Sequence, residues 1–272
     1  MQTVCCLLLT TLPFNVGPYS EAFLAAGVFA LHSMAKTAYN VTVKEITSTL
    51  LTRSTADFPA VLNPLLADAK LRHYPKGQII LYEGENPTDA FIIKHGAVKI
   101  YDIDEDGNEK ILHVLKAPAV FPGLFMFGLS GTPGSGQTST FYTTVAESEL
   151  YVISRAAFES RLSTDVALMH YCMRWFASEV QEILRRMSSL EKTSTRSKLL
   201  ATLVYLSRQH ADEPRLGWQK VQFPVSHQLL ADMIGVTRES TTMVMKDLQK
   251  EQIVRTPKLG TLEINHLLIT NL

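Results

Sequence analysis

The residues with the clearest capacity for chemistry lie in two stretches of this 272-residue sequence. Residues 131–138 read G-T-P-G-S-G-Q-T, which has the spacing of a phosphate loop, G-x-x-x-x-G-K-[ST], with Gln137 in place of the lysine. The second stretch, T-R-E-S-T-T-M at 237–243, crowds polar side chains just after a glycine. The first would bind a nucleotide, and the second would suit the start of a helix that meets a polar surface.

The sequence around the glycine stretch argues against nucleotide hydrolysis. A working phosphate loop lies between a buried strand and a helix, and its lysine neutralises phosphate charge. Here S-T-F-Y-T-T-V-A follows, and its β-branched and aromatic residues predict a further strand. Nothing in the chain alternates strand with helix, and no carboxylate for magnesium stands in a parallel sheet. We therefore expect neither an NTPase nor any other enzyme, and no catalytic residue.

The second stretch belongs to a predicted helix-turn-helix. Ser226 is a good N-cap for a short helix, Gly235 supplies a left-handed turn, and Thr237 caps a second helix whose first residues can reach base edges. An ordinary helical hairpin is the alternative. The segments Ile253–Arg255 and Thr261–Ile264 predict a β-hairpin directly after the second helix, which favours a winged helix and DNA binding.

Upstream, the middle of the chain predicts a small antiparallel barrel or sandwich. A short amphipathic helix is expected over residues 57–71, and Asp106-Gly107 is a strong hairpin signal. Short apolar runs separated by turn residues predict the strands, which are Gln78–Tyr82, Ala90–Lys94, Ala97–Ile103, Lys110–Leu115, Phe141–Val145 and Leu150–Ile153.

After Phe158 the apolar period becomes helical. With Val166 at heptad position a, four consecutive heptads are apolar at both a and d. This pattern predicts a dimer seam, and a helix packed only on its own barrel is the alternative. The seam residues are Val166, Met169, Met173, Phe176, Val180, Ile183, Met187 and Leu190. A further helix is expected over Thr195–His210 and a strand over Val221–Val225.

Residues from about 57 to 270 resemble the CRP/FNR superfamily of bacterial transcription regulators. The motifs that carry the resemblance are Gly77, Glu83-Gly84-Glu85, Asp89-Ala90-Phe91, Gly96-x-Val98-Lys99, Asp106-Gly107 and L-A-D-M-I-G-V-T-R-E-S at 230–240. The resemblance implies an α+β chain with an N-terminal antiparallel β-roll of the cyclic-nucleotide-binding type, a long dimerisation helix and a C-terminal winged helix-turn-helix. The expected division is an N-terminal extension at 1–56, a β-roll sensor domain at 57–161, the dimerisation helix at 162–191 and the DNA-binding domain at 192–272.

The resemblance also assigns residues to DNA. Arg238 and Glu239 occupy the positions that read bases in the family, where arginine can bond a guanine edge and glutamate can accept from a cytosine amine. Met243 stands where the family often has a basic residue, so the half-site need not match that of the best-known members. The expected base-reading residues are Arg238, Glu239, Ser240 and Met243. Those expected to hold phosphate are Ser226, Gln228, Thr237 and Lys246, although Lys246 also fits a plain surface lysine.

The same comparison bears on the effector. Relatives that bind cyclic nucleotides carry a cassette with a glutamate for the ribose and an arginine followed by serine or threonine for the phosphate. Register places these positions at Gly123–Leu124 and Thr138–Ser139, and both charged residues are missing. Residues 117–146 hold no charged side chain, and burying a phosphate without a guanidinium is costly. We expect no cofactor and no cAMP or cGMP, which leaves an apolar effector or a self-filled pocket. The alternative is a cyclic-nucleotide-gated protein that uses the same roll.

Composition sets the partners and the compartment. Net charge is zero, but residues 191–272 carry eleven Lys and Arg against eight Asp and Glu, a net of +3 that suits a polyanion. The expected partners are double-stranded DNA with a near-palindromic site, a second copy of the chain and, for an activator, RNA polymerase. No apolar stretch is long enough to span a bilayer, and no basic residue precedes Lys36, so we expect a cytoplasmic protein. Met34 is an alternative start.

The remaining reactive side chains predict no metal or disulfide site. Three cysteines are too few and too badly spaced for a disulfide framework. His73, His95 and His113 stand on separate strands or turns and are interpreted as structural or solvated. Cys172 falls at heptad position g, where it is a buried cysteine or a reporter of oxidation.

Overall fold

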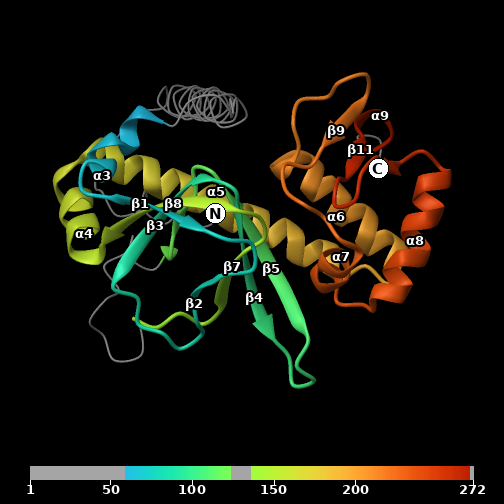
Figure 1. The fold of residues 1–272 in the computed structure, drawn as a ribbon, viewed down its shortest axis with the longest axis horizontal. Coiled ribbons are helices and arrows are strands. Elements are labelled where there is room, and N and C mark those ends of the chain that lie inside the picture. The colour runs from blue at the N-terminus through green and yellow to red at the C-terminus, as the bar shows by residue number, and fades with distance from the viewer. Residues whose placement is uncertain (1–58, 124–135, 270–272) are drawn as a thin grey trace, which may run out of the picture. The chain divides into compact units, whose positions relative to one another are not determined.

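The computed structural model describes residues 59–123 and 136–269, which belong to one compact unit (Figure 1). The N-terminal extension, Leu124 and most of the G-T-P-G-S-G-Q-T stretch lie outside the described residues. Among the helices that are described, none has the length and apolar character needed to cross a membrane.

The first part is a β-roll of two four-stranded antiparallel sheets (Figure 1). One sheet has the order β1-β8-β3-β6 and the other β2-β7-β4-β5. The strands are β1 Lys70–Tyr74, β2 Ile79–Leu81, β3 Asp89–His95, β4 Ala97–Ile103, β5 Glu109–Lys116, β6 Val120–Phe121, β7 Phe141–Thr144 and β8 Ser148–Ser154. Every strand expected for the roll is present, and β1 and β6 are additional.

The expected helix over residues 57–71 is wrong in its second half. Only the short turn η1 (Ala60–Leu62) and the helix α3 (Asn63–Leu66) are helical, and Lys70 already begins β1. Four of the five β1 residues are exposed, so the sequence of this edge strand lacks the alternation of apolar and polar residues that predicts a strand. Its backbone pairs with β8 from Lys70 opposite Val152 to Tyr74 opposite Ser148, and this pairing decides the conformation.

Two glycines turn the chain between the roll's strands. Gly107 has a φ of +82° in the β4–β5 hairpin, and its N–H donates to the Asp104 carbonyl at 2.9 Å, which confirms the expected turn. Gly96 joins β3 to β4 with a φ of +91°, and a Cβ there would lie 2.2 Å from Ser148 Oγ. Both the dihedral angle and the space therefore require glycine at position 96.

Three helices follow the roll: α4 Arg155–Thr164, α5 Val166–Leu190 and α6 Thr195–His210. Asp165 separates the first two, because its backbone is extended and its carboxylate accepts the Leu168 N–H at 3.0 Å as an N-cap. Leu168, Cys172 and Trp175 of α5 are buried against the core of the roll.

The C-terminal part is a winged helix (Figure 1). Its remaining elements are β9 Trp218–Lys220, α7 His227–Ile234, α8 Arg238–Lys250, β10 Val254–Arg255, β11 Glu263–Asn265 and α9 His266–Ile269. The three strands form one sheet in the order β10-β11-β9. The strand expected at 221–225 is wrong, because β11 pairs with residues 218–220 instead and Val221 makes only an isolated bridge to Ala211.

Candidate nucleic-acid interface and the junction behind it

Local capping fixes the angle between α7 and α8. Ser226 Oγ accepts the Leu229 N–H at 3.0 Å and begins α7, and Gly235 ends it with φ +65° and ψ +46°. Thr237 Oγ1 then accepts the Ser240 N–H at 3.2 Å and begins α8. These three positions are the ones that the sequence predicted for the helix-turn-helix.

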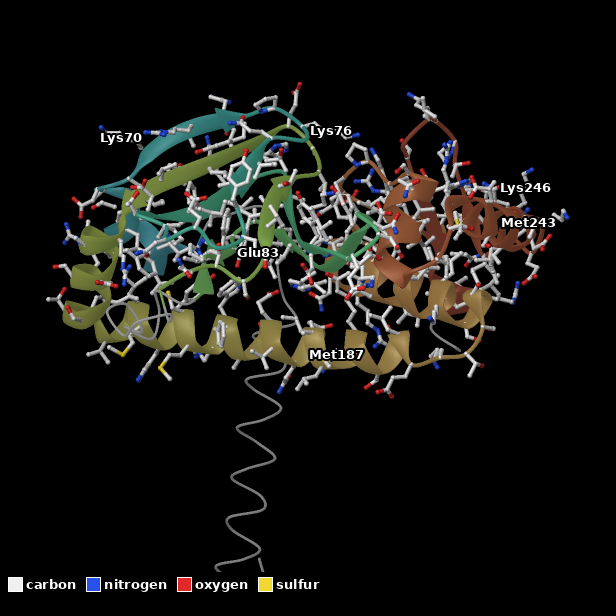
Figure 2. The ribbon with its side chains drawn as sticks, turned by 90° about the horizontal axis from the view of Figure 1, so that it is seen from below. Lys70, Lys76, Glu83, Met187, Met243 and Lys246 are labelled. Atoms are coloured by element: carbon white, nitrogen blue, oxygen red, sulfur yellow. The ribbon has the colours of Figure 1, made fainter. Side chains whose placement is uncertain are left out.

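The second helix buries one face and exposes the other. Thr241, Met245 and Leu248 are buried against α6 and α7. Met243 is 67% exposed, and Figure 2 shows it with Lys246 on the outer side of α8. Apolar and basic side chains are therefore presented together on the free face of this helix.

The expected base-reading residues do not all share one face of α8. Glu239 and Met243 lie one turn apart, whereas Arg238 lies beside Thr242, whose hydroxyl donates to the Arg238 carbonyl at 2.8 Å. Arg238 and Glu239 are both exposed. Ser240 is half-buried, and its hydroxyl accepts from Thr237 Oγ1 at 3.0 Å, so part of its hydrogen-bonding capacity is used within the cap.

The expected phosphate-holding residues differ in how free they are. Ser226 and Thr237 each accept an N–H of their own helix, and both hydroxyls lie at helix N-termini, where an anion is favoured. Gln228 Nε2 donates to Asp232 Oδ1 at 2.7 Å. Lys246 is exposed, and within the described residues it has no salt-bridge partner.

The structure adds His227 and Thr242 to this surface. His227 Nδ1 lies 2.9 Å from Thr242 Oγ1, which ties the start of α7 to α8. Burial lowers the pKa of His227, and the positive charges of Arg238 and Lys246 lower it further. The imidazole thus lies in the electrostatic field of two residues expected to contact DNA. In the sequence, His227 could have been assigned to this surface because it directly follows the predicted N-cap Ser226.

Behind the helix-turn-helix, one buried arginine joins three elements, and we call this contact the Arg186 junction. Arg186 of α5 is 3% exposed. It donates to the carbonyl oxygens of Leu112 and Ile111 in β5, both at 2.8 Å, and to that of Met233 in α7 at 2.6 Å. Burial lowers its pKa, and its Nη1 has no hydrogen-bond partner among the described residues.

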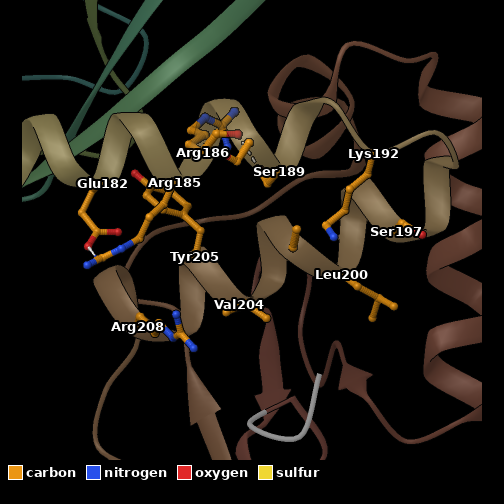
Figure 3. Close-up of a pocket in the computed structure, with 12 residues that line it drawn as sticks. Glu182, Arg185, Arg186, Ser189, Lys192, Ser197, Leu200, Val204, Tyr205 and Arg208 are labelled. Atoms are coloured by element: carbon orange, nitrogen blue, oxygen red, sulfur yellow. Dashed lines mark hydrogen bonds and ion pairs between the residues drawn. The ribbon is translucent and has the colours of Figure 1, made fainter.

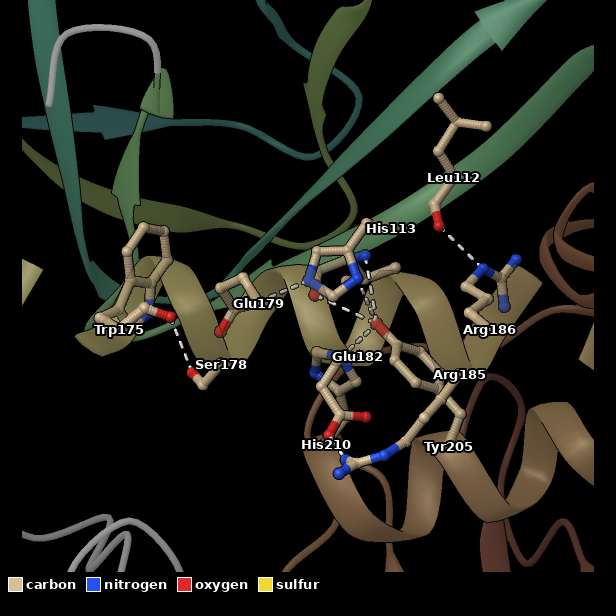
Figure 4. A network of polar contacts seen from close by, with 11 residues as sticks. Leu112, His113, Trp175, Ser178, Glu179, Glu182, Arg185, Arg186, Tyr205 and His210 are labelled. Atoms are coloured by element: carbon tan, nitrogen blue, oxygen red, sulfur yellow. Dashed lines mark hydrogen bonds and ion pairs between the residues drawn. The ribbon is translucent and has the colours of Figure 1, made fainter. Parts of the chain in front are cut away.

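A chain of polar contacts runs beside the Arg186 junction (Figure 4). His113 Nε2 lies 2.6 Å from the Glu179 carboxylate, and its Nδ1 lies 3.1 Å from the Tyr205 hydroxyl. His210 Nε2 approaches the same hydroxyl at 3.1 Å. The tautomer of His113 in which Nε2 donates to Glu179 and Nδ1 accepts from Tyr205 satisfies both contacts. Burial raises the pKa of Tyr205, which keeps its proton available for this arrangement.

The three histidines singled out from the sequence differ in their burial. His113 is 2% exposed and belongs to the structural core, whereas His73 and His95 are exposed. Cys172 is 1% exposed, and burial raises the pKa of its thiol to about 12. No cluster of metal-ligating side chains occurs in residues 59–123 and 136–269.

The described part of the effector cassette is occupied by the protein's own contacts. Thr138 is 3% exposed, and its hydroxyl donates to the Tyr82 carbonyl at 2.5 Å. Its N–H donates to the Glu85 carbonyl at 2.9 Å, and Ser139 is exposed. Gly123 lies against α5, where an added Cβ would approach the Phe176 ring at 2.9 Å.

The heptad residues of α5 fall into two groups. Positions a are exposed, with Val166 at 64%, Met173 at 50%, Val180 at 38% and Met187 at 58%. Ile183 at position d is 37% exposed, and Figure 2 shows Met187 on the side of α5 turned away from the sheets. The other d residues, which are Met169, Phe176 and Leu190, are half-buried.

Two family models match this chain. The model of the cyclic nucleotide-binding domain matches residues 71–165, and that of the Crp-like helix-turn-helix domain matches residues 197–267. The matched ranges contain the roll with α4, and the winged helix. Together they cover 166 of the 272 residues.

Similar proteins share this arrangement over most of their length. The cAMP-activated global transcriptional regulator Vfr of Pseudomonas aeruginosa is 25% identical over 198 residues, which are 71% of this chain and 88% of Vfr. The global nitrogen regulator of Synechococcus elongatus is 23% identical over 188 residues, 68% of this chain and 81% of that protein.

Solved structures agree on the fold. FixK2 from Bradyrhizobium japonicum matches with a TM-score of 0.61 at 18% identity, covering 75% of this chain and 96% of FixK2. A CooA mutant from Carboxydothermus hydrogenoformans matches with a TM-score of 0.63 at 17% identity, covering 80% and 96%. With a β-roll, a long helix and a winged helix-turn-helix in this order, the chain belongs to the CRP/FNR family of DNA-binding transcription regulators.

Proposed function

We propose that this regulator acts as a homodimer that presents two α8 helices to a near-palindromic DNA site, and that its roll does not take a cyclic nucleotide. The observation that carries the proposal is the row of exposed apolar side chains on α5 at Val166, Met173, Val180 and Met187. Apolar residues spaced by heptads and left open on one protomer are typical of a coiled-coil partner surface. A two-fold dimer then places its half-sites about one helical turn apart.

Both heptad positions contribute to the proposed dimer, but in different ways. The half-buried Phe176 lies against Gly123 of its own roll, so the d residues would connect the roll to the partner helix. The exposed a residues have no such second role within the described residues. A substitution at an a position is therefore the cleaner test of dimerisation.

The test is Met187→Glu. In a dimer, the two introduced carboxylates would be buried against each other in the seam. Burying each ion costs on the order of several kcal/mol. We expect the variant to sediment as a monomer and to lose tight binding to a palindromic site. Leu216→Glu, which replaces a fully exposed leucine of the head, is the matched control and should remain dimeric. A dimeric Met187→Glu protein would contradict the seam.

The contacts of the described part of the cassette support the second half of the proposal. Thr138 stands at the expected arginine position, and its N–H, carbonyl and hydroxyl are all engaged by residues 82–85. In the core of the roll, the rings of Phe91 and Phe121 stack at 5.2 Å, and those of Phe121 and Tyr142 stack at 5.3 Å. Burial raises the pKa of Tyr142, as expected for a ring enclosed by the roll.

A titration of the purified protein with cAMP and cGMP tests this half separately. We expect no saturable heat change, because residues 117–146 offer no guanidinium to a cyclic phosphate. Saturable micromolar binding of either nucleotide would contradict the proposal and favour the cyclic-nucleotide-gated alternative for the roll.

A further inference from the structure

A pocket lies between the C-terminal turns of α5 and the helix α6, away from the cassette in the sequence (Figure 3). Its volume is about 500 Å³, which is within the usual range for small-molecule sites. We call it the elbow pocket, because it lies where the long helix passes into the DNA-binding head.

Cations dominate the rim of the elbow pocket. Arg185, Lys192 and Arg208 line it, against the single carboxylate of Glu182. Glu182 is paired with Arg185, so its charge is already matched. Lys192 and Arg208 are exposed, and neither has an ion-pair partner among the described residues. Figure 3 shows Arg208 near Arg185 at one end and Lys192 near Ser197 at the other.

The floor between these cations is apolar. Leu200, Ala201 and Val204 of α6 line it, together with the buried ring of Tyr205. Cationic side chains at the rim and apolar side chains at the floor suit a ligand that has an apolar body and anionic groups. An inorganic ion would leave the floor unused, and a neutral apolar molecule would leave the two free cations unmatched.

The pocket remains open in the proposed dimer. Ser189, which lines the pocket, comes nine residues after Val180 of the seam, or about two and a half helical turns, so the two side chains point in opposite directions. Arg185 is likewise about 200° away from Ile183 around the helix. A partner helix on the seam therefore covers the face opposite the pocket.

We propose that the elbow pocket binds a small organic anion with an aromatic or aliphatic body and more than one negative charge. Lys192 and Arg208 neutralise the charges, and Leu200 and Val204 cover the body. This ligand chemistry differs from that of the cyclic-nucleotide cassette, and the site uses none of the residues expected to contact DNA. Because its walls come from both helices, a bound ligand contacts α5 and the head at once.

The test is calorimetric titration of the full-length protein, without DNA, with 2-naphthyl phosphate. This probe combines an aromatic body with a dianionic group, whereas 2-naphthol offers the body alone and inorganic phosphate the charge alone. We expect saturable binding of 2-naphthyl phosphate at least tenfold tighter than binding of either fragment. No saturable binding, or equal affinity for one of the fragments, would overturn the proposal.

Two variants locate the binding. Lys192→Gln combined with Arg208→Gln should weaken binding of 2-naphthyl phosphate at least tenfold, and both side chains are exposed, so the fold should be retained. Lys76→Gln changes an exposed lysine on the roll and should leave the affinity unchanged. Equal affinity in the double variant and the parent would show that the probe binds elsewhere, and the proposal would be wrong.

Discussion

Arg186 gives the most direct test of how α5 holds the roll and the head together. The change Arg186→Met keeps a long, flexible side chain but removes every donor. Three carbonyl oxygens then lose a charge-assisted hydrogen bond, and at about 1.5–3 kcal/mol each the gross loss is roughly 4.5–9 kcal/mol. The variant also gains stability, because the parent buries a cation that has no carboxylate partner, and that burial costs on the order of several kcal/mol. We expect a net destabilisation of about 2–4 kcal/mol.

Equilibrium unfolding in guanidinium chloride measures this difference, at one protein concentration because the stability of the proposed dimer would depend on concentration. The neighbouring Arg185→Met is the matched control. Arg185 is 61% exposed and paired only with Glu182 among the described residues, so its loss should cost no more than about 0.5 kcal/mol. An Arg186→Met protein as stable as its parent would refute the reasoning, because desolvation of the guanidinium would then outweigh its three hydrogen bonds.

Two further predictions concern the head. Arg238→Ala should weaken specific DNA binding by about 1–3 kcal/mol per half-site and relax the preference for one base pair. Non-specific binding, which depends on salt, should persist. If a random-site selection gave the variant an unchanged consensus sequence, Arg238 would not read a base. The lowered pKa of His227 predicts that the unfolded chain, whose histidine titrates near 6.5, binds more protons than the folded one just below that pH. The free energy of unfolding should therefore fall as the pH drops through 6.5. His227→Gln should make the free energy of unfolding depend less steeply on pH in this range, and an identical pH dependence in the variant would contradict the role of His227.

Local chemistry explains why the helix-turn-helix could be placed from the sequence. Ser226 and Thr237 each bond an N–H three residues away, and Gly235 needs only its own freedom to adopt a positive φ. Such signals are contained within a few neighbouring residues. The Asp106-Gly107 hairpin was predictable for the same reason.

The junction behind the head could not be predicted this way, because its partners are distant in the chain. Arg186 lies 74 and 75 residues from the carbonyls that it binds in β5, and His113 lies 92 residues from Tyr205. A carbonyl acceptor has no residue type, so no motif marks it. The α5 heptads were visible, but the burial of Phe176 against Gly123 follows from the roll and not from the period of the helix.

Adjacent residues of α5 connect the proposed dimer contact to DNA binding. Met187 is exposed on the seam, and Arg186, one residue earlier, is hydrogen-bonded to β5 and to the last turn of α7. Met233 lies only two residues before Gly235, whose turn sets the direction of α8. If α5 rotated against its partner helix while α7 stayed in place, the hydrogen bond from Arg186 to Met233 would be strained. The Arg186 hydrogen bonds are thus one connection between the seam of the proposed dimer and the turn that directs α8.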